Sequence, residues 1–302
     1  MRGASTHRKP SSPDAPAPAP PAPPGPGGTG QNAGVLPRLI ATDLDGTLLD
    51  PNGQLRPRTV AALEAAADAG VIVVFATGRP PTVAVGEVTA AGRGVHYGVM
   101  ANGTFICSLP DATLLHSITF GYPEAAATVH TVRAHDPRYG FALATDRGFT
   151  SEPGFHQRMP VHTPNDVPQP DALVGHEGAS VTIKLLAFHP EHTAHEVMEL
   201  LAPVVGPEMV VSHLGADAVE IAPAGADKGV GLAWLCRHLD IDAADVLVFG
   251  DEVNDLPMFR VAGRRVAVEN ANPHVRQAAD EICPPNTEEG VAQVIERLLA
   301  HG

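Results

Sequence analysis

The sequence predicts an α/β protein whose core is a doubly wound parallel sheet, interrupted by an inserted α+β cap domain. Two blocks, residues 37–120 and 217–302, alternate short apolar strands with helices. The residues between them, 121–216, mix strand and helix patterns in another order and have the length of a normal domain. Acidic residues also follow the apolar strands directly, at the edge where open α/β sheets bind ligands.

Residues 1–36 are rich in proline, alanine, glycine and serine and have almost no bulky apolar side chains. Such a segment cannot bury enough surface to offset the loss of chain entropy. We therefore expect a disordered tail with polyproline II character. Composition alone gives only weak support for binding to an SH3-like protein, so no protein partner of the tail is expected.

The first block follows the order strand, helix, strand. Residues 38–42 form an apolar strand, and residues 57–69 combine helix-forming alanines with apolar side chains on one side. Gly70 ends this helix, and residues 71–76 form a second buried strand. A unit of this kind pairs its strands in parallel and is almost always right-handed.

The rest of the chain completes both domains. Residues 158–178 carry four prolines and little periodicity, which indicates a loop. The expected elements are antiparallel strands at 97–107 and 113–119, helices at 124–134 and 192–201, strands at 180–188, 245–249 and 264–268, and helices from Asp227, near Pro273 and at 288–300.

The formal net charge of −14 argues against sequence-independent binding of nucleic acid, which depends on clustered lysine and arginine. An acidic chain that handles an anionic substrate needs local positive charge to do so. Only three of the 20 basic residues are lysines, namely Lys9, Lys184 and Lys228. Each lysine is therefore of interest as a local charge.

The three cysteines, Cys107, Cys236 and Cys283, are widely spaced and include no CxxC motif, which suits free thiols in a reducing compartment. The longest apolar stretches are strand-sized and fall short of the ~20 residues that span a bilayer. The prolines near the N-terminus also prevent the helical apolar region of a signal peptide. We therefore expect a cytoplasmic protein with no membrane partner.

Two aspartates, Asp43 and Asp45, follow the first strand on a turn with Gly46 and Thr47. One carboxylate can attack phosphorus to form an aspartyl-phosphate, and a second can protonate the leaving oxygen and later deprotonate water. These two jobs need different pKa values, which a metal and local hydrogen bonds can provide.

Three further motifs lie directly after a predicted strand or at the start of a predicted helix. Thr77, Gly78 and Arg79 follow the second strand, where a hydroxyl and free backbone amides suit phosphate oxygens. Lys228 begins a helix and supplies a point charge. The segment 250–255 follows a third core strand with carboxylates suited to Mg²⁺. Each motif alone is also a common turn sequence, but their convergence at one sheet edge favours a shared site that needs a cation.

These four ordered motifs resemble those of haloacid dehalogenase superfamily phosphatases, and in particular the Cof-type branch with a large α/β (C2-type) cap. The similarity covers roughly residues 37–300, without the tail. Further marks of the branch are Met100–Gly103, Val181–Lys184, Asn270–Ala271 and Pro285–Val291.

The resemblance implies roles in catalysis and metal binding. Asp43 is expected to be the nucleophile and a Mg²⁺ ligand. Asp45 is expected to be the general acid and base, and to offer its backbone carbonyl to the metal. Asp251 would be the third protein ligand, and Asp255 would support either the metal shell or Lys228.

The resemblance also implies a phosphate-binding set. Thr77 and Lys228 are expected to bind the phosphoryl group, with Gly78 and Arg79 beside it, and Asn254 is expected to contact phosphate. No motif position departs from the family pattern. The expected activity is Mg²⁺-dependent hydrolysis of a small phosphorylated metabolite.

Two other functions stay open. A sugar phosphomutase of the same superfamily would pass the phosphoryl group to a sugar, although the cap has no evident arginine-rich sugar-phosphate motif. A regulatory or scaffold protein would act through the proline-rich tail. Sugar phosphates, pyridoxal phosphate and nucleotide-like phosphates all remain candidate substrates.

Three other features are ambiguous. His189, His192 and His195 have a spacing that suits a metal site on a helix, but surface histidines are far commoner there. Trp234 has the spacing of a packing residue rather than of a substrate platform. Lys184 either faces the active site or lies in solvent, and the sequence favours neither.

Overall fold

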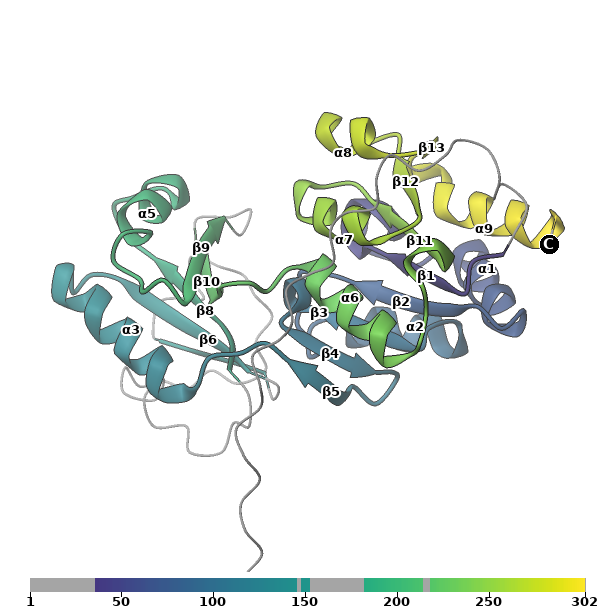
Figure 1. Cartoon of the computed structure of the whole chain (residues 1–302). Helices are drawn as coiled ribbons and strands as arrows, with labels where there is room; N and C mark the ends of the chain where they lie inside the picture. Colours follow the sequence, from purple (N-terminus) through teal and green to yellow (C-terminus); the bar gives the residue numbers. More distant parts are fainter. Residues whose placement is uncertain (1–35, 146–147, 153–181, 214–217, 302) are drawn as a thin grey trace, which may run out of the picture.

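The computed structural model describes residues 36–145, 148–152, 182–213 and 218–301. These residues form two sheets, each with its own helices (Figure 1). The larger sheet combines strands from both ends of the sequence, and the smaller sheet is built from its middle. This arrangement confirms the predicted fold class, a parallel-sheet core with an inserted α+β domain.

The core sheet has eight strands in the order β13-β12-β11-β1-β2-β3-β4-β5. The first six of these run parallel, and β4 and β5 are antiparallel at one edge. The strands are β1 (Leu39–Thr42), β2 (Ile72–Ala76), β3 (Tyr97–Met100), β4 (Phe105–Ser108), β5 (Thr113–Ser117), β11 (Val246–Gly250), β12 (Arg264–Val268) and β13 (Glu281–Cys283).

The order in which strands are added to the sheet reverses at β1. Strands β2 and β3 lie on one side of β1, and β11, β12 and β13 lie on the other. Leu39 pairs with Ile72 of β2 on one side and with Val246 of β11 on the other. Crevices for ligands form at such switch points, beyond the carboxyl ends of the strands. The residues that follow β1 and β11 therefore meet at the position where this fold class builds its sites.

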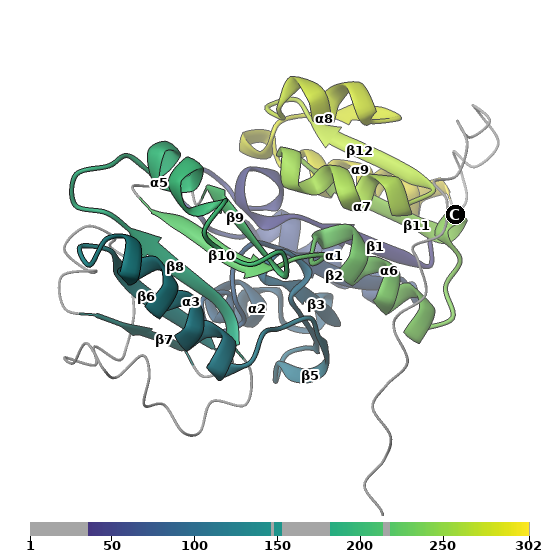
Figure 2. The same ribbon diagram turned by 60° about the vertical axis from the view of Figure 1, so that its left-hand side comes forward.

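Helices cover both faces of the core sheet (Figure 2). On one face α1 packs against α2 and α9, and on the other α6 packs against α7. The bounds are α1 (Pro57–Asp68), α2 (Val85–Ala91), α6 (Lys228–His238), α7 (Leu256–Val261), α8 (Pro273–Ala278) and α9 (Gly290–His301).

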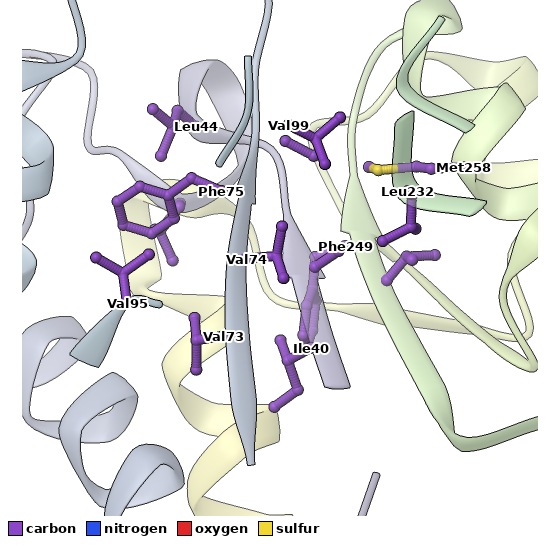
Figure 3. Close-up of a cluster of buried hydrophobic side chains, with 14 of the residues drawn as sticks. Ile40, Leu44, Val73, Val74, Phe75, Val95, Val99, Leu232, Phe249 and Met258 are labelled. Carbon is purple, nitrogen blue, oxygen red and sulfur yellow. The ribbon is translucent and has the colours of Figure 1, made fainter. Parts of the chain in front are cut away.

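The central parallel strands β1, β2 and β11 are almost entirely apolar because both of their faces are buried. Successive side chains of β2 point to opposite faces, so Val74 and Phe75 pack on different sides of the sheet. Phe75 lies with Leu44 and Val95, and Val74 lies near Phe249 (Figure 3). This packing on both sides fixes the ends of the strands, and hence the residues that follow them.

The second sheet is antiparallel, in the order β7-β6-β8-β10-β9. Helices α3 and α5 pack on one of its faces in a separate apolar cluster that includes Val129, Val197, Leu185 and Ile221. The bounds are α3 (Tyr122–His135), β6 (Gly140–Thr145), β7 (Gly148–Ser151), β8 (Thr182–Phe188), α5 (Ala194–Leu201), β9 (Met209–His213) and β10 (Val219–Pro223). We call this unit the cap.

The predicted domain boundary at residue 216 requires correction. Strand β10 pairs with β8 and β9 in the cap sheet, so the insertion extends to Pro223. Residues 219–223 were not predicted as a strand because Glu220 and Pro223 interrupt the apolar run that marks the core strands. The starting boundary at residue 121 agrees with α3, which begins at Tyr122.

The predicted antiparallel pairing of residues 97–107 is also partly wrong. This segment contains two strands, and the first of them, β3, runs parallel to β2. Asn102 and Gly103 reverse the chain between β3 and β4, with φ values of +55° and +87°. The other predicted helices and strands are present, with shifted ends. The strands β6, β7, β9, β10 and β13 and the helices α2 and α7 were missed, and the predicted tail and the loop at 158–178 lie outside the described residues.

Candidate active site

Strand β1 ends in a turn that carries the two aspartates. Asp43 leaves the strand in an extended conformation and is buried. Gly46 adopts φ +81°, and a Cβ atom there would overlap the carboxylate of Asp251. Glycine is therefore required on both conformational and steric grounds. Thr47 orients the same carboxylate, because its Oγ1 donates to Asp251 Oδ1 at 2.7 Å.

Two asparagines from the C-terminal part of the chain hold this turn in place. Asn270 Nδ2 donates to the carbonyl oxygen of Gly46 at 2.7 Å. Asn286 donates from its backbone N–H to Asn270 Oδ1 at 3.0 Å, and from Nδ2 to the carbonyl oxygen of Leu49 at 2.8 Å. In the sequence these residues are only marks of family similarity, but in the structure they hold the turn that carries Asp43 and Asp45.

Lys228 begins α6 and is buried between two carboxylates. Its Nζ donates to Asp43 Oδ1 at 2.5 Å and to Asp255 Oδ1 at 2.6 Å. Burial alone would lower the pKa of Lys228, but the two carboxylates outweigh this effect and raise the pKa. Asp227 caps the helix by accepting from the N–H of Val230 at 2.7 Å. The lysine is therefore a positive charge in a fixed position.

The three carboxylates of Asp43, Asp251 and Asp255 form the candidate metal group. All three are buried, and each offers an oxygen within 4.8 Å of the other two. Burial raises the pKa of Asp251 to about 6. Burial also raises the pKa of Asp43 well above its usual range, although Lys228 opposes this shift. Buried carboxylates of this kind fit a hard divalent cation such as Mg²⁺, which takes oxygen ligands and favours their ionised form.

Asp255 contacts both Lys228 and the loop that carries Asp251. Besides contacting Lys228, its Oδ2 accepts from the backbone N–H groups of Asp251 and Glu252, at 2.9 and 3.0 Å. A Cβ atom at Gly250 would overlap the Asp255 side chain. Asp255 therefore holds both the lysine and the loop that carries Asp251.

Asp45 is not part of this carboxylate group. Its two oxygens accept from Arg79, from Nη2 at 2.5 Å and from Nε at 2.8 Å. Arg79 also donates from Nη1 to Glu87 Oε1 at 2.7 Å. The hydrogen bond with Asp45 raises the pKa of Arg79. No motif marks Glu87, so the sequence did not indicate its place beside the site.

The loop after β2 brings the candidate phosphate-binding residues together. Thr77 is fully buried, and its Oγ1 accepts from the backbone N–H of Arg79 at 3.1 Å. Its carbonyl oxygen accepts from the backbone N–H of Asn102 at 3.0 Å. Asn102 Oδ1 in turn accepts from Asn254 Nδ2 at 3.1 Å. Asn102 therefore joins the second motif to the fourth, a role that its Asn–Gly turn did not reveal.

Lys184 points from the cap strand β8 toward the core. Its Nζ donates to Glu220 Oε2 at 2.6 Å and to the carbonyl oxygen of Gly78 at 3.3 Å. Only 6% of the side chain is exposed. Of the two placements left open by the sequence, solvent is excluded, and Lys184 lies beside the candidate phosphate loop.

His189 and Trp234, whose roles are ambiguous in the sequence, have structural roles. His189 lies against Asp136 at 3.2 Å and accepts from the N–H of Glu191 at 3.2 Å. Across the described ranges, only the three aspartates meet the geometry of a metal group. Trp234 stacks on His116 with ring centroids 4.6 Å apart, as a packing residue does.

Comparison with known proteins places the chain in a family. The family model for haloacid dehalogenase-like hydrolases matches residues 40–295. The chain belongs to this superfamily, in its Cof-type branch of phosphatases. None of the helices in the described ranges has the length and apolarity needed to cross a membrane.

Particular relatives agree with this assignment. The chain is 30% identical over 281 residues to the HMP-PP phosphatase of Yersinia pestis (strain Pestoides F), covering 87% of this chain and 96% of the relative. Its structure is similar to TM0651 from Thermotoga maritima, with a TM-score of 0.74 and 26% identity. The match covers 87% of this chain and 97% of TM0651. It is also similar to a haloacid dehalogenase-like hydrolase from Bacteroides thetaiotaomicron, with a TM-score of 0.75 and 23% identity. This match covers 86% of this chain and 99% of the hydrolase.

Proposed function

We propose that this protein is a Mg²⁺-dependent phosphatase that hydrolyses a small phosphomonoester through a phosphorylated Asp43. The observation that supports this most strongly is the buried contact of Lys228 with Asp43 and Asp255, next to Asp251. It combines a candidate nucleophile, a fixed cation and an oxygen group suited to a metal. This is the set of parts that phosphoryl transfer to a carboxylate needs.

In this mechanism an Asp43 oxygen attacks phosphorus while the leaving oxygen departs in line with it. Lys228 orients the attacking carboxylate and offsets charge on the phosphoryl oxygens. Thr77 and the backbone N–H groups after it offer hydrogen bonds to the same oxygens. Mg²⁺, held by Asp43, Asp251 and the backbone carbonyl of Asp45, would supply further charge stabilisation.

Asp45 then serves as the general acid and base. It protonates the leaving oxygen and later takes a proton from the water that hydrolyses the phosphorylated Asp43. In the structure both Asp45 oxygens accept from Arg79. A proton on either Asp45 oxygen weakens the hydrogen bond that this oxygen accepts from Arg79, because a neutral carboxyl group is a poorer acceptor than a carboxylate. Arg79 is then free to turn one N–H group toward the phosphoryl oxygens.

The cap would select the substrate. Because the Yersinia relative is an HMP-PP phosphatase, HMP-PP is the first compound to test. Sugar phosphates, pyridoxal phosphate and nucleotide-like phosphates complete the panel.

The three cysteines are free and buried, which supports our placement of the enzyme in the cytosol.

The test is phosphate release by the purified protein from this panel, with and without Mg²⁺. We expect turnover that requires Mg²⁺ and that Asp43→Asn abolishes without loss of the folded state. Release without an added bisphosphate activator would distinguish a phosphatase from a phosphomutase. Near-normal turnover by Asp43→Asn would contradict the proposal.

A further inference from the structure

A chain of hydrogen bonds joins the cap sheet to the loops of the candidate active site. Its centre is Glu220 in β10, which has only 6% of its surface exposed. Glu220 Oε2 accepts from Lys184 Nζ at 2.6 Å. Glu220 Oε1 accepts from Ser212 Oγ and from Asn102 Nδ2, each at 3.2 Å. Lys184 and Ser212 belong to the cap, whereas Asn102 belongs to the core.

The position of Glu220 follows from the alternation of side chains along the cap strands. Glu220 pairs with Leu186 of β8, so Lys184, two residues earlier, lies on the same face of the sheet. The alternate residues Ile221 and Leu185 pack in the cluster beneath α3 and α5. Glu220 and Lys184 therefore point away from the cap helices and toward the core.

Each of these two cap residues contacts one of the core segments that carry the candidate phosphate-binding residues. Lys184 reaches the carbonyl oxygen of Gly78, next to Thr77. Glu220 reaches Asn102, whose backbone N–H donates to Thr77 and whose Oδ1 accepts from Asn254. The Lys184–Glu220 ion pair of the cap therefore contacts both of these core segments.

We propose that Glu220 is a positioning residue, which couples the seating of the cap to the placement of Asn254 and the Thr77 loop. This inference rests on the proposed function, because it concerns the residues assigned there to the phosphoryl group. Asn102 is the intermediate. Its Nδ2 donates to Glu220 and its Oδ1 accepts from Asn254, so the cap carboxylate sets which way the amide faces.

A carboxylate is required at position 220 because all three of its side-chain partners donate hydrogen bonds to it. A glutamine has only one oxygen acceptor. If that oxygen accepts from Lys184, the NH₂ group of the glutamine faces Asn102 Nδ2. Two hydrogen-bond donors then point at each other. Asn102 can relieve this conflict by flipping, which points its Nδ2 at Asn254 Nδ2 and breaks that hydrogen bond unless Asn254 also turns over.

The experiment compares Glu220→Gln with Glu152→Gln. Glu152 is an equally suitable buried glutamate of the cap, with 6% of its surface exposed. It accepts from Arg133 and from the N–H of Phe141, both within the cap. We expect Glu220→Gln to lower kcat/KM for an aryl phosphate by about tenfold or more, and to weaken inhibition by inorganic phosphate. Glu152→Gln should leave both values within about twofold of the native enzyme.

A second readout does not depend on turnover. Hydrogen exchange at the Asn102 amide, which donates to Thr77, should accelerate in Glu220→Gln and stay unchanged in Glu152→Gln. If Glu220→Gln folds poorly, Lys184→Met/Glu220→Leu removes both buried charges and leaves Asn102 Nδ2 without its acceptor, so the loss of kcat/KM should persist in it.

Native kcat/KM together with native exchange at Asn102 in Glu220→Gln would overturn the proposal. Native values in a folded Lys184→Met/Glu220→Leu variant would do the same. If the native protein releases no phosphate from any compound, the proposed function fails on its own. The exchange measurement then still decides whether Glu220 controls the Asn102 turn.

Discussion

Lys228 Nζ lies 2.5 Å from Asp43 Oδ1, and neither side chain has more than 7% of its surface exposed. The contact joins residues 185 positions apart, at the end of β1 and the start of α6. Either charge alone would be costly at this depth, because burial removes its hydration. The two elements that carry them are therefore linked electrostatically as well as by packing.

Replacement of Lys228 by methionine should impair both folding and catalysis. The change leaves the Asp43 and Asp255 carboxylates in a buried site without their cation. We expect the free energy of unfolding in EDTA to fall by about 3–5 kcal/mol, as for other broken buried ion pairs. We expect kcat to fall by at least about 10²-fold. Urea unfolding and steady-state kinetics measure these effects, and turnover within tenfold of the native enzyme would contradict the assigned role.

Replacement of Asp251 by asparagine should stabilise the metal-free protein while abolishing its response to Mg²⁺. Burial raises the pKa of Asp251 from 3.8 to about 6, so the folded state binds its proton more tightly than the unfolded state does. This group therefore costs stability as the pH rises from 3.8 to about 6, and the cost is constant above that range. At pH 7.5 we expect a gain on the order of 1–3 kcal/mol in EDTA.

Thermal unfolding of the native protein and Asp251→Asn, in EDTA and in MgCl₂, provides the measurement. The native protein should gain Tm on addition of Mg²⁺, and the variant should not. A variant that is less stable in EDTA at pH 7.5, yet still gains Tm with Mg²⁺, would show that Asp251 is not a ligand.

Alanine substitutions at two glycines separate backbone strain from steric overlap. Gly46 and Gly53 both have positive φ, at +81° and +73°. A Cβ atom at Gly46 would overlap the Asp251 carboxylate, whereas Gly53 has open space around it. We expect Gly53→Ala to cost about 1–2 kcal/mol with full activity, and Gly46→Ala to cost more and to lose activity. Equal effects of the two changes on kcat would contradict a tight fit at Gly46.

Replacement of Arg79 by lysine tests the bidentate contact with Asp45. A lysine offers a charge but no planar pair of N–H groups, so it cannot hold both carboxylate oxygens. We expect kcat/KM to fall by about 10–100-fold while the fold is retained. Arg58→Lys is the matched control, because Arg58 uses the same two groups, Nε and Nη2, on Glu296 at the surface. An equal loss in both variants would refute a specific role of Arg79.

Local patterns predicted much of the core. The strands β1, β2 and β11 are almost continuous apolar runs, and such runs are the signal of a parallel sheet buried on both faces. The cap strands other than β8 were missed because polar residues, such as Ser212 in β9 and Glu220 in β10, interrupt the apolar runs that mark the core strands. The parallel pairing of β3 was missed because Asn102 and Gly103 reverse the chain in so few residues.

The sequence by itself determined the class of fold, the four motifs and the residues at their centres, because each is encoded within a few neighbouring positions. Only the tertiary structure decided that Arg79 holds both oxygens of Asp45, that Asp255 joins the carboxylate group, and that Lys184 and Glu220 face the core. These contacts join segments that lie far apart in the sequence. They arise from the way the cap and the two halves of the core pack together, and no local periodicity records that packing.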